Sequence, residues 1–300
     1  MADAGAQSGG RIVLVATPIG NLDDLSPRAV AALAAADVIA AEDTRRTGRL
    51  LAHLGLKRPL LRYDDHTERD RADALVERAI AGQTVALATD AGTPGISDPG
   101  FALVRAAVDR DVPIELIPGP VAAIHALVLS GLPTDRFVFE GFLPRKAGQR
   151  GRRIAALAGD ERTLIVYLSP HRAAEELEAL RAMLGPRPAA LARELTKLHE
   201  QIVRRSLDGL AELAAREALR GELTLVIAGA PADGRRTAVT DAELVERVRE
   251  LIATGEARNA AVASVARTAG VARTRVYDAV TAATLRSTTH DEGRGRPETR

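Results

Sequence analysis

Three glycine-containing loops carry the residue types whose spacing suits ligand binding. They cover residues 17–21, 90–97 and 118–122, and each follows an apolar segment typical of a buried strand. Glycine lets a ligand approach the backbone closely, and ligands of open parallel sheets bind beyond the carboxyl ends of the strands. We therefore expect the three loops to line one binding site.

The motifs that are missing limit what this ligand can be. The chain has no G-x-G-x-x-G after its first predicted strand and no G-x-x-x-x-G-K-[ST], which disfavours dinucleotides and nucleoside triphosphates. A ligand with adenosine and amino-acid parts but no phosphate fits the loops better. Asp90 offers such a ligand a polar group, although an Asx-type turn explains this residue equally well on spacing alone.

Strands and helices must position these loops. Their sequence signals alternate along the chain, which indicates an α/β fold with largely parallel strands. The predicted strands cover 11–16, 38–41, 84–89, 113–117, 137–140, 163–168, 189–193, 202–206 and 223–228. The predicted helices cover 26–36, 47–54, 68–81, 98–109, 151–158, 173–184, 207–217, 241–253, 257–268 and 274–283. The adjacent strands at 189–193 and 202–206 predict an antiparallel pair. Ser26-Pro27 and Asp98-Pro99 are each predicted to cap and begin a helix.

The order of these elements predicts five regions. A disordered N-terminus at 1–10 precedes an N-terminal α/β domain at 11–119 and a C-terminal α/β domain at 120–230. A polar linker at 230–238 leads to a small helical appendage at 239–285, and 286–300 form a disordered tail.

Composition excludes several classes of protein. The chain has 41 basic and 40 acidic residues, a net charge of +1, and no cysteine. Disulfides, thiolate zinc sites and a cysteine nucleophile are therefore excluded, and the six histidines lack the spacing of metal ligands. No apolar stretch is long enough to span a bilayer, and MADAGAQSGGR lacks the features of a signal peptide. We expect a cytoplasmic protein without a metal.

Several blocks of sequence together resemble one family. They are VATPIGNLDDLSPRA, AAEDTRRTGRLL, TDAGTPGISDPG, IPGPVAAIHALVLSGLPTDRFVFEGFLPRK, YLSPHR and ARELTKLHE, in this order. They are similar to the bacterial 16S rRNA 2′-O-ribose methyltransferase I family of the tetrapyrrole-methylase-like superfamily. The segment at 257–280 also resembles the small helical appendage of that family.

The resemblance implies a two-domain tetrapyrrole-methylase-like fold with S-adenosylmethionine (AdoMet) in the cleft between the domains, and a homodimer. It implies methyl transfer to the ribose 2′-hydroxyl of a cytidine in the decoding region of 16S rRNA, naked or in the 30S subunit. Carried over by motif, the AdoMet contacts are Asp90, Ala91, Gly92, Ile96, Val121, Ala122, Leu168, Ser169, Leu191, Ala192 and Thr224. Leu168 departs from the family, whose members often have glutamate before SPHR, so any chemical role of that glutamate is absent here.

Transfer to a ribose hydroxyl requires loss of a proton, which a base or a polarising cation near it would assist. The predicted catalytic candidates in the acceptor-side loops are Asn21, Glu42, Asp43, Arg45, Glu194 and Lys197. A helix-start cap with a local ion pair equally explains Glu42, Asp43 and Arg45, and structural salt bridges equally explain Glu194 and Lys197.

A basic segment at 144–153, PRKAGQRGRR, is predicted to be a glycine-containing loop beside the cleft. Positive charge binds RNA phosphates, although a charge run also occurs on an ordinary solvated face. The predicted RNA-binding residues are Arg145, Lys146, Arg150, Arg152 and Arg153.

Two other functions remain open at this point. One is a tetrapyrrole-precursor C-methyltransferase, against which the basic segment, the appendage and the EDTR and SPHR blocks all stand. The other is a catalytically idle RNA-binding assembly factor, against which the intact loop at 90–97 stands.

Overall fold

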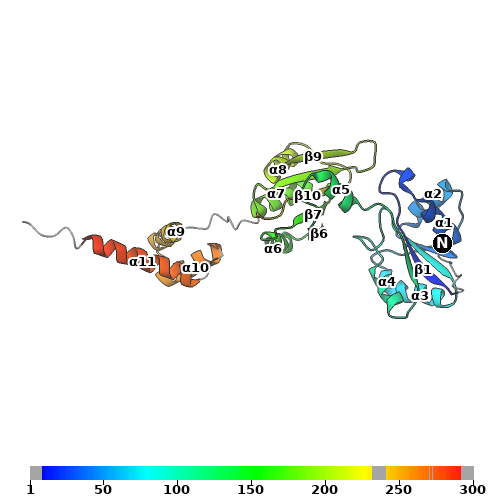
Figure 1. The fold of residues 1–300 in the computed structure, drawn as a ribbon, viewed down its shortest axis with the longest axis horizontal. Coiled ribbons are helices and arrows are strands. Elements are labelled where there is room, and N and C mark those ends of the chain that lie inside the picture. The colour runs from blue at the N-terminus through cyan, green and yellow to red at the C-terminus, as the bar shows by residue number, and fades with distance from the viewer. Residues whose placement is uncertain (1–8, 232–240, 270, 272, 292–300) are drawn as a thin grey trace, which may run out of the picture. The chain divides into compact units, whose positions relative to one another are not determined.

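The computed structural model describes residues 9–231, 241–269, 271 and 273–291 of the chain. It divides into two compact units, Met1–Ala230 and Pro231–Arg300. The described part of the first unit contains two five-stranded sheets with their covering helices (Figure 1). The predicted linker residues 232–238 and the predicted disordered residues 1–8 and 292–300 lie outside the described residues.

The first sheet is parallel, in the order β3-β2-β4-β1-β5. Its strands are β1 (Arg11–Val15), β2 (Val38–Ala41), β3 (Leu60–Arg62), β4 (Thr84–Ala88) and β5 (Ile114–Ile117). The associated helices are η1 (Leu22–Asp24), α1 (Pro27–Ala35), α2 (Thr44–His53), α3 (Glu68–Ile80) and α4 (Phe101–Val108). Nearly all of β1, β2 and β4 is apolar because both faces of the sheet are covered.

Alternation along the strands divides the core of this sheet into two layers. Ile12 and Leu14 pack in one cluster with Leu103 of α4, whereas Val13 and Val15 pack in another with residues of α1 and α2. Because all of these strands are parallel, the loops that follow β1, β4 and β5 leave the sheet at the same edge.

The second sheet is mixed, in the order β6-β7-β10-β8-β9. Its strands are β6 (Phe137–Phe142), β7 (Thr163–Leu168), β8 (Pro188–Arg193), β9 (Gln201–Ser206) and β10 (Leu223–Ile227). The sheet packs against α5 (Ala122–Ser130) in one cluster and against α6 (Ala147–Leu157), α7 (Ala173–Leu184) and α8 (Leu207–Arg216) in another. The predicted antiparallel pair is confirmed as β8 and β9.

The described part of the second unit has its own hydrophobic core. Its helices are α9 (Asp241–Ala253), α10 (Arg258–Ala269) and α11 (Arg273–Asp291). Leu244, Val262 and Val276 meet at its centre. The helix predicted at 274–283 runs to Asp291, so residues 286–291 of the predicted tail are helical.

The elements β3 and α5 were not predicted, for different physical reasons. β3 has only three residues, too few to show an alternating pattern. The sequence of α5, AAIHALVLS, is apolar on nearly every side, so it lacks the helical period that distinguishes a helix from a buried strand. Its exposed Ile124 and Val128 remove the contrast between a buried and a solvated face.

The basic segment was predicted as a loop followed by a helix from residue 151, and the loop prediction is wrong for residues 147–150. α6 begins at Ala147 and continues through both glycines of the segment. Gly148 and Gly151 lie within this helix, and a Cβ added at either would meet no atom within 4 Å. Glycine lowers helix propensity by only about 1 kcal/mol relative to alanine, and packing of Ile154 and Leu157 in the core outweighs it.

Candidate active site

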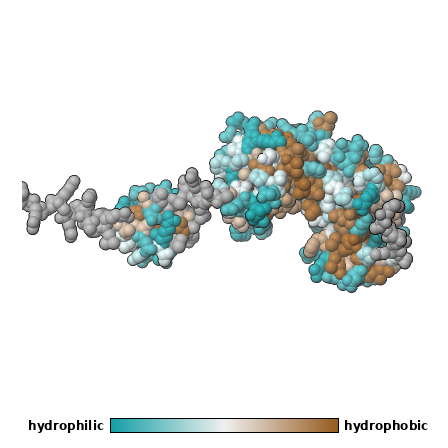
Figure 2. Space-filling model, in the orientation of Figure 1, coloured by the Kyte–Doolittle hydropathy of each residue, from teal (hydrophilic) through white to brown (hydrophobic). Residues whose placement is uncertain are grey.

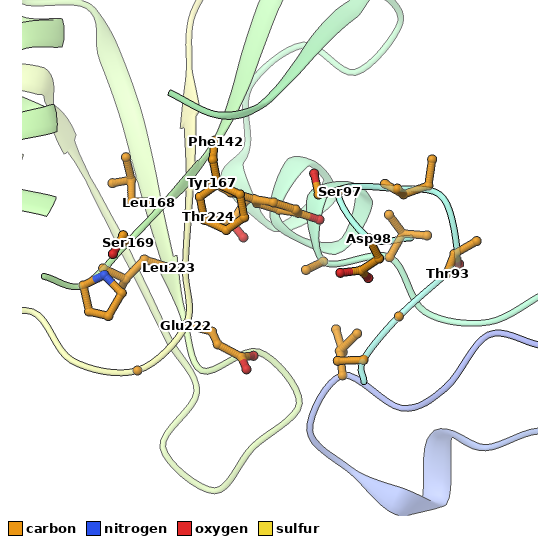
Figure 3. Close-up of a pocket in the computed structure, with 18 residues that line it drawn as sticks. Thr93, Ser97, Asp98, Phe142, Tyr167, Leu168, Ser169, Glu222, Leu223 and Thr224 are labelled. Atoms are coloured by element: carbon orange, nitrogen blue, oxygen red, sulfur yellow. The ribbon is translucent and has the colours of Figure 1, made fainter. Parts of the chain in front are cut away.

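A cavity of about 420 Å³, here called the first cavity, lies between residues of the two sheets of the first unit. One side is formed by the loop between β4 and α4, together with Ile19 and the start of α5. The other side is formed by the end of β6, the end of β7 and the residues that lead into β10. Figure 3 shows these two groups of side chains facing each other.

The loop between β4 and α4 is held against the loop after β1. Thr17 and Gly92 exchange two backbone hydrogen bonds, of 2.9 and 3.0 Å. The hydroxyl of Thr17 donates a third hydrogen bond, of 3.1 Å, to the carbonyl of Thr89. Gly92 has a φ of 84°, in the left-handed region that favours glycine. These bonds fix the backbone that lines the first cavity.

Asp98 was predicted to cap the following helix, and that prediction is wrong. α4 begins at Phe101, and its N-cap is Gly100. The backbone N–H of Gly100 donates to Glu68 of α3 over 2.9 Å. An acidic side chain from another helix therefore accepts a hydrogen bond from a backbone N–H at the start of α4. Asp98 lines the first cavity instead.

The environment of Asp98 makes its carboxyl group titrate near neutral pH. Burial, followed by the nearby carboxylates of Glu42, Asp90 and Asp65, raises its pKa to about 7. A half-buried carboxyl group whose charged neighbours are carboxylates favours the protonated, neutral form. A cationic ligand in the cavity would compensate the charge of the ionised form.

Two aromatic residues form the opposite wall. The rings of Phe142 and Tyr167 have centroids 5.5 Å apart, and the Tyr167 side chain extends toward Ser97 and Asp98 (Figure 3). The hydroxyl of Tyr167 accepts a 3.2 Å hydrogen bond from the backbone N–H of Ala123 in the first turn of α5. This bond ties the second sheet to the helix that follows the 118–122 loop.

A bulge in β6 allows the two sides to approach each other. The register shifts between Phe139 and Gly141, and Gly141 has a φ of 66°. A Cβ at Gly141 would lie 3.3 Å from Oγ of Ser97, which is a tight contact. Glycine is therefore the residue that suits this point, and the bulge precedes the strand end at which Phe142 reaches the cavity.

Most of the predicted AdoMet contacts meet in the first cavity. Those that line it are Ala91, Gly92, Ile96, Val121, Ala122, Leu168, Ser169 and Thr224. Leu191 and Ala192 do not line it, because both are almost fully buried in the clusters on the two faces of the second sheet. Asp90 does not line it either and lines a second cavity on the other side of its loop.

Sequence reasoning missed Asp98, Phe142, Tyr167 and Glu222 as lining residues. One signal could have found the aromatic pair. The chain has only four phenylalanines and three tyrosines, and two of these seven residues lie at strand ends beside the cleft. Glu222 gave no such signal because its place depends on how the chain enters β10.

The acidic residues after β2 form a network with Asp90. The backbone N–H of Asp43 donates to Asp90 over 3.1 Å, and the backbone N–H of Asp90 donates to Glu42 over 3.2 Å. Arg46 pairs with Asp90 at 3.3 Å. Burial raises the pKa of both Glu42 and Asp90. The network joins the ends of β2 and β4.

Asp43 and Arg45 have local partners. The carboxylate of Asp43 accepts from the backbone N–H of Arg45 at the start of α2, over 2.9 Å, and its pKa is lowered by hydrogen bonds from Arg45. Because Asp43 caps it, α2 begins at Thr44, three residues before the predicted start at Thr47. Asn21 caps η1 by accepting from Asp23 over 3.1 Å.

Glu194 and Lys197 also have structural partners. Glu194 accepts from Lys197 over 3.0 Å and from the backbone N–H of Glu222 over 2.8 Å. Lys197 also pairs with Glu222 at 3.2 Å. A Cβ at Gly20 would lie 2.5 Å from Cγ of Lys197, so the loop after β1 packs closely against this side chain.

The predicted RNA-binding residues divide into two groups. Arg150 is buried and pairs with Glu175, and Arg153 pairs with Glu140. The side chains of Arg145, Lys146 and Arg152 are exposed, and no ion pair is found for them within the described residues. The exposed group is the part of the segment that is available to a partner.

Two further observations concern only the described part of the chain. It contains no group of three or more histidine, cysteine, aspartate or glutamate residues that could hold a metal ion. None of its helices has the length and apolar character needed to cross a membrane.

Comparisons with known proteins identify relatives of the chain. The pattern of the tetrapyrrole (corrin/porphyrin) methylases matches residues 11–211. The ribosomal RNA small subunit methyltransferase I of Synechocystis sp. is 45% identical over 269 residues, covering 89% of this chain and 96% of that protein. The protein of the same name from Mycobacterium tuberculosis is 46% identical over 277 residues, covering 91% and 95%.

A solved structure shares the fold. The uroporphyrin-III C-methyltransferase from Thermus thermophilus has a TM-score of 0.54 at 23% identity and covers 73% of this chain and 94% of its own. The match of residues 11–211 and the identities of 45% and 46% lead to one conclusion. The chain belongs to the tetrapyrrole methylase family and, within it, to the ribosomal RNA small subunit methyltransferase I group.

Proposed function

We propose that this chain is an AdoMet-dependent methyltransferase that 2′-O-methylates the ribose of a cytidine in the decoding region of 16S rRNA. The observation that carries the proposal is its identity of 45% across 96% of a relative named ribosomal RNA small subunit methyltransferase I. The first cavity supports it, because a methyltransferase requires a site for a methyl donor beside a site for the acceptor.

The first cavity suits AdoMet in size and chemistry. Its volume of about 420 Å³ lies within the range of roughly 300–1,000 Å³ found for small-molecule sites. Tyr167 and Phe142 supply aromatic rings, which attract cations, and Asp98 and Glu222 supply carboxylates. When bound, AdoMet supplies a methyl carbon activated by a sulfonium.

We assign AdoMet contacts to the predicted residues that line the first cavity and add Asp98, Phe142, Tyr167 and Glu222. The charge of Asp98 is costly while the cavity holds no cation, since burial and three neighbouring carboxylates oppose it. The positive charge of the donor offsets this cost, so the donor binds more tightly to the protein in which Asp98 is ionised. Leu168, which is buried at the end of β7, contributes packing and backbone only.

Positioning then provides much of the acceleration. Holding two reacting groups in the correct geometry can be worth effective molarities on the order of 10⁵ M or more. The Thr17–Gly92 bonds fix the backbone on one side of the cavity, and the Tyr167–Ala123 bond joins the two sides. In this proposal the domains at 11–119 and 120–230 hold the donor between them, and the RNA approaches the edge of the first sheet.

The exposed basic residues of the α6 region extend the RNA surface. Arg145, Lys146 and Arg152 are available for phosphates, whereas Arg150 and Arg153 hold α6 in place.

The proposal includes action in the cytoplasm as a homodimer. Ile124, Val128 and Leu129 of α5 are 42%, 66% and 37% exposed, and hydrophobic surface is gathered on this part of the first unit (Figure 2). Such surface is typical of a contact between subunits.

Transfer of a labelled methyl group tests the proposal. Purified protein is incubated with methyl-labelled AdoMet and, separately, with 30S subunits, naked 16S rRNA and a tetrapyrrole precursor. The RNA is digested to nucleosides, and we expect the label in 2′-O-methylcytidine from the 30S subunit or the naked rRNA. Label only in the tetrapyrrole, or only on a base of the RNA, would refute the proposal.

A further inference from the structure

A second cavity, of about 500 Å³, opens beside α2 in the first unit. It is formed by α2 together with the loops after β1 and β4, and none of its lining residues lines the first cavity. Of the residues predicted to contact AdoMet, Asp90 alone lines this second cavity. Its chemistry therefore requires a separate explanation.

The two cavities lie on opposite sides of one thin partition. Ile19 and Gly92 line the first cavity, whereas Thr17 and Asp90, in the same two loops, line the second. The paired backbone bonds between Thr17 and Gly92 hold this partition together. A ligand in the second cavity is consequently adjacent to the backbone that contacts the donor.

The floor of the second cavity contains a polar group without a partner. Thr89 is 2% exposed, and its Oγ1 makes no hydrogen bond in the described structure. The neighbouring hydroxyl of Thr17 already donates its hydrogen bond to the carbonyl oxygen of Thr89. Buried polar groups are nearly always hydrogen-bonded, so an unsatisfied one requires an explanation. A ligand with a polar edge provides it.

The walls and rim of this cavity differ in character. Leu22, Leu50 and Pro18 supply apolar surface, and Leu22 is 48% exposed. At the rim, Arg46, Arg49 and His53 project from α2 at the spacing of i, i+3 and i+7, which places them on one face of the helix.

The cations of this rim are unequally compensated. Arg46 is paired with Asp90. Arg49 and His53 are exposed, and neither has an ion pair in the parts of the chain that the structure describes. Arg49 therefore offers an available guanidinium for a phosphate, with which arginine forms strong, often bidentate hydrogen bonds.

We propose that the second cavity binds one nucleotide of the acceptor RNA strand. Its base lies against the apolar wall with a polar edge toward Thr89, and its phosphate lies at the rim on Arg49. The apolar wall and the threonine of the floor offer phosphate no cation, so the uncharged part of the nucleotide enters and the phosphate stays at the rim. This proposal rests on the proposed function for the identity of the RNA, and unstacked bases of single strands are the usual targets of sequence-specific RNA recognition.

Arg49→Gln tests the contact at the rim, with Arg216→Gln as its matched control. Arg216 belongs to α8, which packs against the second sheet, and its side chain is 80% exposed. Equilibrium binding of a decoding-region RNA fragment is measured over a series of salt concentrations. We expect Arg49→Gln to weaken RNA binding by about 5- to 10-fold and to lower the salt slope by about one. Affinity for AdoMet should stay unchanged, and Arg216→Gln should behave as the wild type.

Thr89→Val tests the contact in the floor. Valine has nearly the same shape but lacks the hydroxyl, so the variant removes an unsatisfied buried group without leaving a hole. We expect a melting temperature equal to or above that of the wild type, and RNA binding weaker by about 3- to 10-fold, the loss of one hydrogen bond. A purely structural threonine would change the melting temperature without changing RNA affinity.

The outcomes distinguish this proposal from the proposed function. If the wild type binds and methylates RNA while both variants bind RNA as it does, the second cavity is not the nucleotide site and the proposed function stands. If the wild type binds RNA without methylating it and both variants weaken binding, the nucleotide site stands and the proposed function fails. If the wild type does not bind RNA, both are overturned.

Discussion

The two cavities differ in chemistry although the same two loops form a wall of each. The first cavity is lined by aromatic and aliphatic residues with two carboxylates, Asp98 and Glu222. The second has a threonine floor and a rim that carries Arg46, Arg49 and His53. The first suits a cation and the second suits an anion with an uncharged end. In our proposal, a partition of two short loops therefore separates a cationic ligand from an anionic one.

The two aspartates of the β4–α4 loop show how this separation arises. Asp90 is held by Arg46 and by the backbone of Asp43, so its charge is compensated within the protein. Asp98 has carboxylates as its charged neighbours, and its pKa rises to about 7. One carboxylate is therefore paired with a cation of the protein, whereas the charged neighbours of the other are carboxylates.

The largest expected effect comes from filling the first cavity. Ala122→Trp places a large ring at the start of α5, where Ala122 lines the cavity. We expect AdoMet affinity to fall by about 100-fold or more, which corresponds to ~2.7 kcal/mol, as measured by calorimetric titration. RNA affinity should change by less than about twofold. An equal loss of RNA binding would show that the two cavities do not act separately.

Asp98→Asn is expected to remove a pH dependence of donor binding. In the wild type, AdoMet affinity should rise by up to about 10-fold between pH 6 and pH 8, because one unit of pKa is a factor of ten and Asp98 must lose its proton. The asparagine variant should bind AdoMet with nearly constant affinity across this range. A wild-type profile that is flat, or that falls with pH, would count against the assigned role.

The same residue makes a prediction about stability, with a definite sign. The folded pKa of about 7 lies above the ordinary value of 3.8, so the folded state binds the proton more tightly than the unfolded state. The stability that Asp98 contributes is present below about pH 4 and is lost as pH rises through about 7. Without ligand, Asp98→Asn should therefore melt above the wild type at pH 8 and close to it at pH 4. The opposite order at pH 8 would contradict the raised pKa.

Gly92→Ala should disturb both cavities through their shared wall. Alanine at a φ of 84° costs roughly 1–2 kcal/mol, and the strain falls on the Thr17–Gly92 bonds. We expect both AdoMet and RNA affinity to fall by about 3- to 5-fold, about 1 kcal/mol. Gly131→Ala is the matched control, since Gly131 has a φ of 76° with nothing within 4 Å of its added Cβ. It should lose similar stability and keep both affinities.

The smallest expected effect separates the two groups of basic residues near α6. Arg152→Gln should change stability by no more than about 0.5 kcal/mol while lowering RNA affinity by about 2- to 3-fold. Arg150→Gln removes a buried partner of Glu175 and should cost about 2 kcal/mol of stability. Chemical denaturation and filter binding measure the two quantities. If Arg152→Gln left RNA binding unchanged, the basic segment would be an ordinary solvated surface.

The sequence predicted those features that depend on local patterns. Apolar runs predicted β1 and β4, and Ser26 caps α1 as its position before a proline suggested. The glycines of the 90–97 loop predicted a ligand site beyond a strand, and residues of this loop line the first cavity. Each of these features is determined by residues close together in the chain.

The features that the sequence did not predict depend on tertiary contacts. Asp98 precedes a proline just as Ser26 does, yet Glu68 from another helix satisfies the start of α4. The second cavity is formed by α2 and two loops that are distant from each other in sequence, so no local motif predicts it. Arg150 and Arg152 look alike in PRKAGQRGRR, and only the packing of α6 shows that one is buried and the other exposed.

The central claim is that one partition separates a donor site from an RNA site, and a crossed binding measurement tests it most directly. AdoMet and RNA dissociation constants are measured for the wild type, Ala122→Trp, Arg49→Gln and the double variant. We predict that Ala122→Trp weakens only AdoMet binding, that Arg49→Gln weakens only RNA binding, and that the double variant shows both losses unchanged in size. Either single variant weakening both ligands equally would contradict the claim.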